Sequence, residues 1–140
     1  MNIYFACSIV GGRQDEAIYM QLVEALQGDG HEVPTAILAG PEVGTLESRA
    51  HPAREVYLRD TAWIEAADAM IAEISTPSHG VGFEIAYALH RAKPVLALHD
   101  ENRMVSKMIT GNNMPGLRVN AYRDLAHAIT QMAEFLASNS

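Results

Sequence analysis

The feature that most constrains the fold of this chain is a regular alternation of short apolar runs with longer amphipathic segments. The apolar runs are typical of buried strands and cover residues 2–8, 31–37, 68–74, 94–99 and 117–121. The amphipathic segments have apolar residues at helical spacing and cover residues 15–27, 52–67, 80–91, 102–110 and 122–137. This alternation predicts βαβ units, and therefore a parallel sheet with helices on both faces.

We expect a three-layer α/β fold of the flavodoxin-like or Rossmann-like type, with a five-stranded parallel sheet in the order 2-1-3-4-5. The run 31–37 is the weakest of the five and favours an edge position, because Pro34 has no N–H to donate. At 140 residues, the chain 1–140 is expected to form one domain. Ligands of such sheets bind beyond the carboxyl ends of the strands, which here are the loops after Ser8, Ile74 and His99.

Charge and cysteine content narrow the partners and the compartment. The formal net charge is −7, which disfavours non-specific binding to a nucleic acid polymer or to an anionic membrane. A small anion can still bind, because backbone N–H groups hold phosphate without net positive charge. Cys7 is the single cysteine, and neither a signal peptide nor a stretch of about 20 apolar residues is visible. We therefore expect a cytoplasmic protein.

The strongest local motif is the segment 75–84, Ser-Thr-Pro-Ser-His-Gly-Val-Gly-Phe-Glu, which joins a buried strand to a helix. Gly80 and Gly82 allow a ligand to approach the backbone closely, and Ser78 can cap the helix and offer a hydroxyl group. The free N–H groups and the dipole at such a helix start suit a phosphate. A capping serine followed by two packing glycines is the alternative interpretation.

Three side chains are candidates for catalysis. Glu84 lies in the first turns of the helix, where a carboxylate either stabilises the helix dipole or attacks an anomeric carbon. Asp60 could assist a leaving group or simply be a solvated helix charge. Tyr4, in the first strand, could reach the crevice or be a core aromatic. The six histidines show no metal-ligand spacing, so we expect neither a metal nor a cofactor.

Several segments together resemble one family. The segments 3–13, 60–68, 77–84, 93–94 and 103–109 are similar, in order and spacing, to the Rcl-type 2′-deoxynucleoside 5′-monophosphate N-glycosidases. Those enzymes fall within the nucleoside 2-deoxyribosyltransferase superfamily. The resemblance extends from residue 3 to about residue 110, and the last helix matches only in general character.

The resemblance implies a role for each matching residue. Glu84 would be the nucleophile, Asp60 would assist departure of the base and then the attacking water, and Tyr4 would contact the sugar and the nucleophile. Ser106 would contact the phosphate of the neighbouring subunit, which implies a homodimer with shared sites. The other substrate-binding residues implied are the phosphate cradle of Ser78, Gly80 and Gly82, and the loop beside sugar and base at Ser8, Ile9 and Gly11.

The chain departs from the resemblance at Val10, where Rcl-type members usually carry a basic residue; Arg13 and Arg103 are the candidates to replace it. The expected function is hydrolysis of the N-glycosidic bond of a nucleoside 5′-monophosphate, with retention at the anomeric carbon. Two alternatives are open: base exchange by a nucleoside 2-deoxyribosyltransferase, and nucleotide binding by a sensor without turnover. The sequence leaves the identity of the base open, and the resemblance at Tyr4 favours deoxyribose over ribose.

Overall fold

The computed structural model describes residues 1–12, 14–41 and 51–140. The helices and strands within these ranges follow one another along the chain in this order: β1 (Ile3–Ala6), α1 (Glu16–Gly28), α2 (Ala36–Ala39), α4 (Ala53–Ala66), β2 (Ala69–Glu73), α5 (His79–His90), β3 (Val95–Asp100), α6 (Lys107–Thr110), β4 (Leu117–Tyr122) and α7 (Leu125–Ala137). The alternation predicted from the sequence is therefore present over most of the chain.

The described strands form one parallel sheet in the order β1-β2-β3-β4. Every residue of β1 and β2 is buried, as expected for parallel strands that helices cover on both faces. The three-layer α/β architecture with a parallel sheet is thus confirmed. The predicted five-stranded sheet of order 2-1-3-4-5 is wrong, because the described residues form four strands.

The missing strand is the segment 31–37. It makes a single parallel bridge, between Glu32 and Asn2, and then turns into α2. Pro34 cannot donate a hydrogen bond to β1. The Phe5 amide instead donates to the buried Thr35 hydroxyl at 3.0 Å, so a side chain replaces the main-chain partner that a strand would supply. Most of the predicted loop 38–51 lies outside the described residues.

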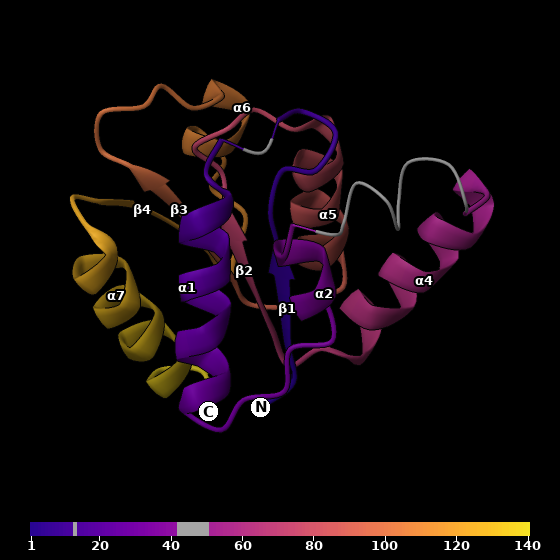
Figure 1. Ribbon diagram of the computed structural model, residues 1–140, viewed down its shortest axis with the longest axis horizontal. Coiled ribbons are helices and arrows are strands. Elements are labelled where there is room, and N and C mark those ends of the chain that lie inside the picture. The colour runs from indigo at the N-terminus through magenta and orange to yellow at the C-terminus, as the bar shows by residue number, and fades with distance from the viewer. Residues whose placement is uncertain (13, 42–50) are drawn as a thin grey trace.

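Two helical layers cover the sheet (Figure 1). Helices α1 and α7 pack on one face and α4 and α5 on the other, and each face has its own cluster of buried apolar residues. Successive residues of a strand point to opposite faces. Ile3 and Phe5 accordingly join the α1/α7 cluster, whereas Tyr4 and Ala6 join the α4/α5 cluster. This parity directs the Tyr4 side chain towards α5.

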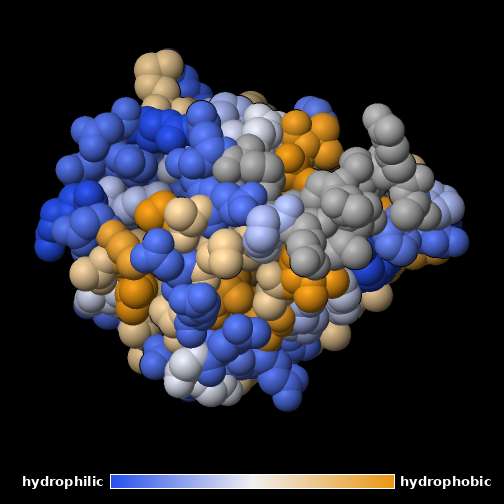
Figure 2. Space-filling model, in the orientation of Figure 1, coloured by the Kyte–Doolittle hydropathy of each residue, from blue (hydrophilic) through white to orange (hydrophobic). Residues whose placement is uncertain are grey.

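The predicted helix over the whole of 102–110 is also not found. The Asp100 carboxylate accepts from the Asn102 amide at 2.8 Å, which closes a turn, and α6 begins only at Lys107 after the capping residue Ser106. No described helix is long and apolar enough to span a membrane. The face shown in Figure 2 carries small hydrophobic patches separated by hydrophilic side chains.

Candidate active site

The loops after β1 and β2 meet at the carboxyl edge of the sheet. A Cβ atom on Gly11 would lie 2.3 Å from the carbonyl oxygen of Pro77, far inside van der Waals contact. Only glycine lets the two loops approach this closely. The resemblance implied a place for Gly11 beside the substrate. The structure explains the glycine by the close packing of the two loops.

The three candidate catalytic side chains come together from three elements on the α4/α5 side of the sheet. The Tyr4 hydroxyl, from β1, donates to Oε1 of Glu84 on α5 at 3.0 Å. Asp60, on α4, is close enough to influence the ionisation of both. The residues are 24 or more positions apart in sequence, so this cluster exists only because of the fold.

The surroundings of Glu84 make its carboxyl group a weak acid. Burial raises its pKa to about 7, the hydrogen bond from Tyr4 lowers the pKa, the charge of Asp60 raises it, and the charge of Arg59 lowers it. The pKa of Tyr4 is raised above its ordinary value by burial, by the charges of Glu84 and Asp60, and by the hydrogen bond to Glu84. The charge of Arg59 lowers it in part. Tyr4 therefore remains a neutral donor, and Glu84 titrates near neutrality. A carboxyl group tuned in this way is typical of catalytic sites.

Glu84 and Asp60 line a cleft of about 580 Å³. Its other lining residues come from the loop after β1, from α4 and the short segment before it, and from the start of α5: Cys7, Ile9, Val10, His51, Ala53, Val56, Tyr57, Ser78, His79, Gly80 and Val81. The cleft is large enough for a small metabolite. Val10 is 87% exposed at its mouth.

The predicted phosphate cradle surrounds the start of α5. Ser78 caps this helix, its hydroxyl accepting from the Val81 amide at 3.3 Å. A Cβ on Gly80 would make only ordinary contact, at 3.7 Å, and one on Gly82 would meet nothing within 4 Å. Packing within the chain therefore does not require glycine at either position. The space left by the missing side chains is available to a ligand.

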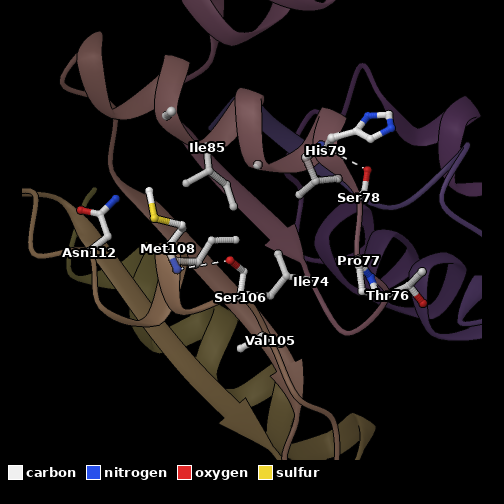
Figure 3. Close-up of a pocket in the computed structure, with 14 residues that line it drawn as sticks. Ile74, Thr76, Pro77, Ser78, His79, Ile85, Val105, Ser106, Met108 and Asn112 are labelled. Atoms are coloured by element: carbon white, nitrogen blue, oxygen red, sulfur yellow. Dashed lines mark hydrogen bonds between the residues drawn. The ribbon is translucent and has the colours of Figure 1, made fainter.

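A second cavity, of about 480 Å³, adjoins the same helix start (Figure 3). Ser78 and His79 line both cavities, whereas Gly82 and Ser106 line only the second. Ser106 caps α6, its hydroxyl accepting from the Met108 amide at 3.2 Å. The chain thus keeps Ser106 away from its own Glu84 cleft.

The remaining predicted residues are less central. Ser8 is fully buried and, like Gly11, is not part of the cleft lining, whereas Ile9 is. Arg13 lies outside the described residues. Arg103 makes contacts at 3.2 Å to Asp15 and 3.3 Å to Thr76, so its guanidinium is engaged away from the Glu84 cleft.

Sequence reasoning missed several residues of the cleft wall, among them Tyr57. A signal was available: Ala53, Val56, Tyr57 and Asp60 follow the helical spacing i, i+3, i+4, i+7 and so share one face of α4. His51 and His79 gave no such pattern. Among the described residues, no group of three or more His, Cys, Asp or Glu side chains is placed to hold a metal ion.

The family model described as nucleoside 2-deoxyribosyltransferase matches residues 3–128. A protein of Methanosarcina mazei with the provisional name 2′-deoxynucleoside 5′-phosphate N-hydrolase 1 is 42% identical over 123 residues, which cover 88% of this chain and 76% of the relative. The 5-hydroxymethyl-dUMP N-hydrolase of Mus musculus is 39% identical over 116 residues, which cover 79% of this chain and 65% of the relative.

Among solved structures, the CMP N-glycosidase of Clostridium botulinum superimposes with a TM-score of 0.70 over 95% of this chain and 99% of that one. Its sequence identity is 18%, so the likeness concerns the fold. The resemblance predicted from the ordered segments is confirmed by the family match and by the curated relatives. The chain belongs to the nucleoside 2-deoxyribosyltransferase family.

Proposed function

We propose that this chain hydrolyses the N-glycosidic bond of a nucleoside 5′-monophosphate, giving the free base and a sugar 5-phosphate. The observation that carries the proposal is the Glu84 carboxyl group, held by the Tyr4 hydroxyl at 3.0 Å in a cleft that also contains Asp60. The names of the relatives from Methanosarcina mazei and Mus musculus support a monophosphate substrate, and they favour deoxyribose.

The phosphate is proposed to dock at the start of α5. The first N–H groups of a helix have no partner within the helix, and its dipole favours an anion there. The Ser78 oxygen accepts from Val81, but its O–H can still donate to a phosphate oxygen. Gly80 and Gly82 leave room at this end. Binding energy gained at the phosphate then holds the anomeric carbon next to Glu84.

The reaction is proposed to run in two displacements. The ionised Glu84 carboxylate attacks the anomeric carbon, the C–N bond breaks, and the base leaves with a proton from a water molecule held by the Asp60 carboxylate. The oxygen of this water molecule then attacks the glycosyl ester, which releases the sugar phosphate and the Glu84 carboxylate. Two displacements retain the configuration at the anomeric carbon.

The test is a panel of ribo- and deoxyribonucleoside 5′-monophosphates, with the released base separated by chromatography. We expect base release from at least one deoxyribonucleoside monophosphate, and a loss of several orders of magnitude in Glu84→Gln. Gln keeps an oxygen that can accept from Tyr4, so the variant should fold. Undiminished turnover in Glu84→Gln would end the proposal, and binding without cleavage would support a nucleotide sensor.

The same proposal includes a homodimer in which Ser106 serves the neighbouring site. Ser106 lines the second cavity rather than its own Glu84 cleft, and nearby Met104 and Met108 are 94% and 84% exposed. Mixing inactive Glu84→Gln subunits with Ser106→Ala subunits should raise activity above that of Ser106→Ala alone. In the mixed dimer, the intact Glu84 of the Ser106→Ala subunit is paired with the intact Ser106 of the Glu84→Gln subunit. No gain on mixing would mean that the sites are not shared.

A transferase is the second candidate, because the matching family model carries that description. It would share the attack by Glu84 but pass the sugar to a second base. Incubation of a nucleoside and of its monophosphate with a different free base separates the two reactions. Base exchange on the unphosphorylated nucleoside would favour the transferase, whereas release of base from the monophosphate alone would favour the hydrolase.

A further inference from the structure

Arg59, which directly precedes Asp60 on α4, has no part in the mechanism above. Its Nε donates to Oδ1 of Asp60 at 2.8 Å, and its Cζ lies 4.8 Å from the centroid of the Trp63 ring. The Arg59 and Asp60 side chains are only 26% and 16% exposed. The guanidinium therefore lies against an indole ring and a carboxylate, next to the Glu84 cleft.

The Trp63 ring explains how consecutive residues can make this contact. Side chains at i and i+1 of a helix point about 100° apart, so an arginine reaches its neighbour's carboxylate only by folding back. Trp63, at i+4 from Arg59, lies one turn further along the same face and packs against the α4/α5 core cluster. Stacking on this anchored ring restricts the guanidinium and keeps its Nε towards Asp60.

The charges around Glu84 give this arrangement a consequence for catalysis. Among the described residues, Tyr4 from β1 and Arg59 and Asp60 from α4 influence Glu84 directly. The other titratable side chains in the cleft lining are those of Cys7, His51, Tyr57 and His79. Asp60 opposes ionisation of Glu84, as one carboxylate does beside another. The Arg59 charge acts in the opposite direction and lowers the pKa of Glu84 and of Tyr4.

We propose that Arg59 is a positioning residue of this active site: it orients the Asp60 carboxylate and offsets its negative charge, so that Glu84 is available as an anion at neutral pH. This inference rests on the proposed function, because it assigns Asp60 and Glu84 their roles in the reaction. Arg59 is not among the residues that line the Glu84 cleft, so it would act through Asp60. Its removal should therefore change how the rate depends on pH, with little effect on the KM for the monophosphate.

Two substitutions separate charge from packing. Arg59→Met keeps an apolar stem over Trp63 but removes the charge, and Arg59→Lys keeps the charge. Arg91 provides a matched control: its Cζ lies 4.5 Å from the Tyr87 ring centroid, and its Nη2 lies 3.2 Å from Oε1 of Glu65. Arg91→Met thus removes a similar stack and ion pair, between side chains that are about half exposed and lie outside the Glu84 cleft.

Two readouts are compared across these variants. The first is kcat/KM against pH; the second is the titration of the Glu84 carboxyl carbon by NMR in ¹³C-labelled protein, assigned by its absence in Glu84→Gln. In Arg59→Met, the NMR midpoint should move to higher pH, and kcat/KM should fall about three- to tenfold more at pH 6 than at pH 8.5. Arg59→Lys should recover most of the loss, and Arg91→Met should match the wild type.

An Arg59→Met midpoint equal to that of the wild type would overturn the inference, as would an equal loss of kcat/KM at both pH values. Thermal denaturation of each variant shows whether it is folded, and Arg59→Gln replaces Arg59→Met if the latter does not fold. The proposed function fails differently, through absence of base release by the wild type or undiminished release by Glu84→Gln. The NMR titration needs no turnover, so it tests the influence of Arg59 on Glu84 in either case.

Discussion

Replacement of Glu84 by glutamine should stabilise the protein at alkaline pH and have little such effect in acid. Burial, opposed by the Tyr4 hydrogen bond, leaves the Glu84 carboxyl group with a pKa of about 7, against an ordinary value of 4.5. A folded-state pKa above the unfolded value means that the folded protein binds the proton more tightly. The free energy of unfolding of the wild type therefore falls as pH rises through this window. Glutamine carries no such titration.

The magnitude follows from the width of the window. A gap of roughly 2.5 pH units corresponds to about 3 kcal/mol, and most of it, about 2.5 kcal/mol, develops between pH 5 and pH 8. The stability of Glu84→Gln relative to the wild type should increase by this amount over that interval. Part of the stability of the fold is, on this reasoning, lost because the proposed nucleophile is buried.

Urea denaturation at pH 5 and at pH 8, followed by circular dichroism, measures the difference. Glu134→Gln makes the same chemical change at an exposed position of α7 and controls for the substitution itself. A Glu84→Gln effect of the same size at both pH values would refute the reasoning, because the carboxyl group would then titrate alike in the folded and unfolded chains. This outcome is independent of whether the protein is an enzyme.

Three further predictions concern activity and packing. With Glu84 titrating at about 7, kcat/KM for base release should rise about tenfold between pH 6 and pH 8; a flat profile would contradict its role as an ionised nucleophile. Gly11→Ala would place a Cβ 2.3 Å from the Pro77 carbonyl and should lower stability by about 1–3 kcal/mol in thermal denaturation, and an unchanged melting temperature would show that the loops separate freely. Thr35→Val leaves the buried Phe5 amide without its acceptor and should cost about 1–3 kcal/mol in urea denaturation; a neutral effect would mean that another acceptor takes over.

The proposed mechanism and the fold are linked through α4. One face of this helix supplies Asp60 and the adjoining cleft wall, and the neighbouring Arg59 contacts Asp60 from a position stacked on Trp63. The start of α5 supplies the proposed phosphate cradle, and its second turn supplies Glu84. The two helices lie on the same side of the sheet, so the proposed phosphate-binding and reacting groups are held by one packed layer.

The amino-acid sequence by itself determined the α/β class, the parallel sheet and the family, because these depend on local periodicity and on ordered motifs. It also singled out Tyr4, Asp60 and Glu84 as candidates, although their catalytic roles stay predictions. It misled at residues 31–37, where an apolar run resembled a strand. The balance between Pro34, which cannot donate, and the Thr35 hydroxyl, which accepts from Phe5, depends on the neighbouring strand and cannot be read from the run itself.

Only the tertiary structure decided which side chains share a cleft and how acidic they are. The alternation of β1 turns Tyr4 towards α5, and packing of α5 on the sheet brings Glu84 within 3.0 Å of its hydroxyl. The same packing removes water from Glu84 and raises its pKa to about 7. Desolvation and charge proximity are properties of the folded surroundings, because residues 80 positions apart come into contact only when the chain has folded.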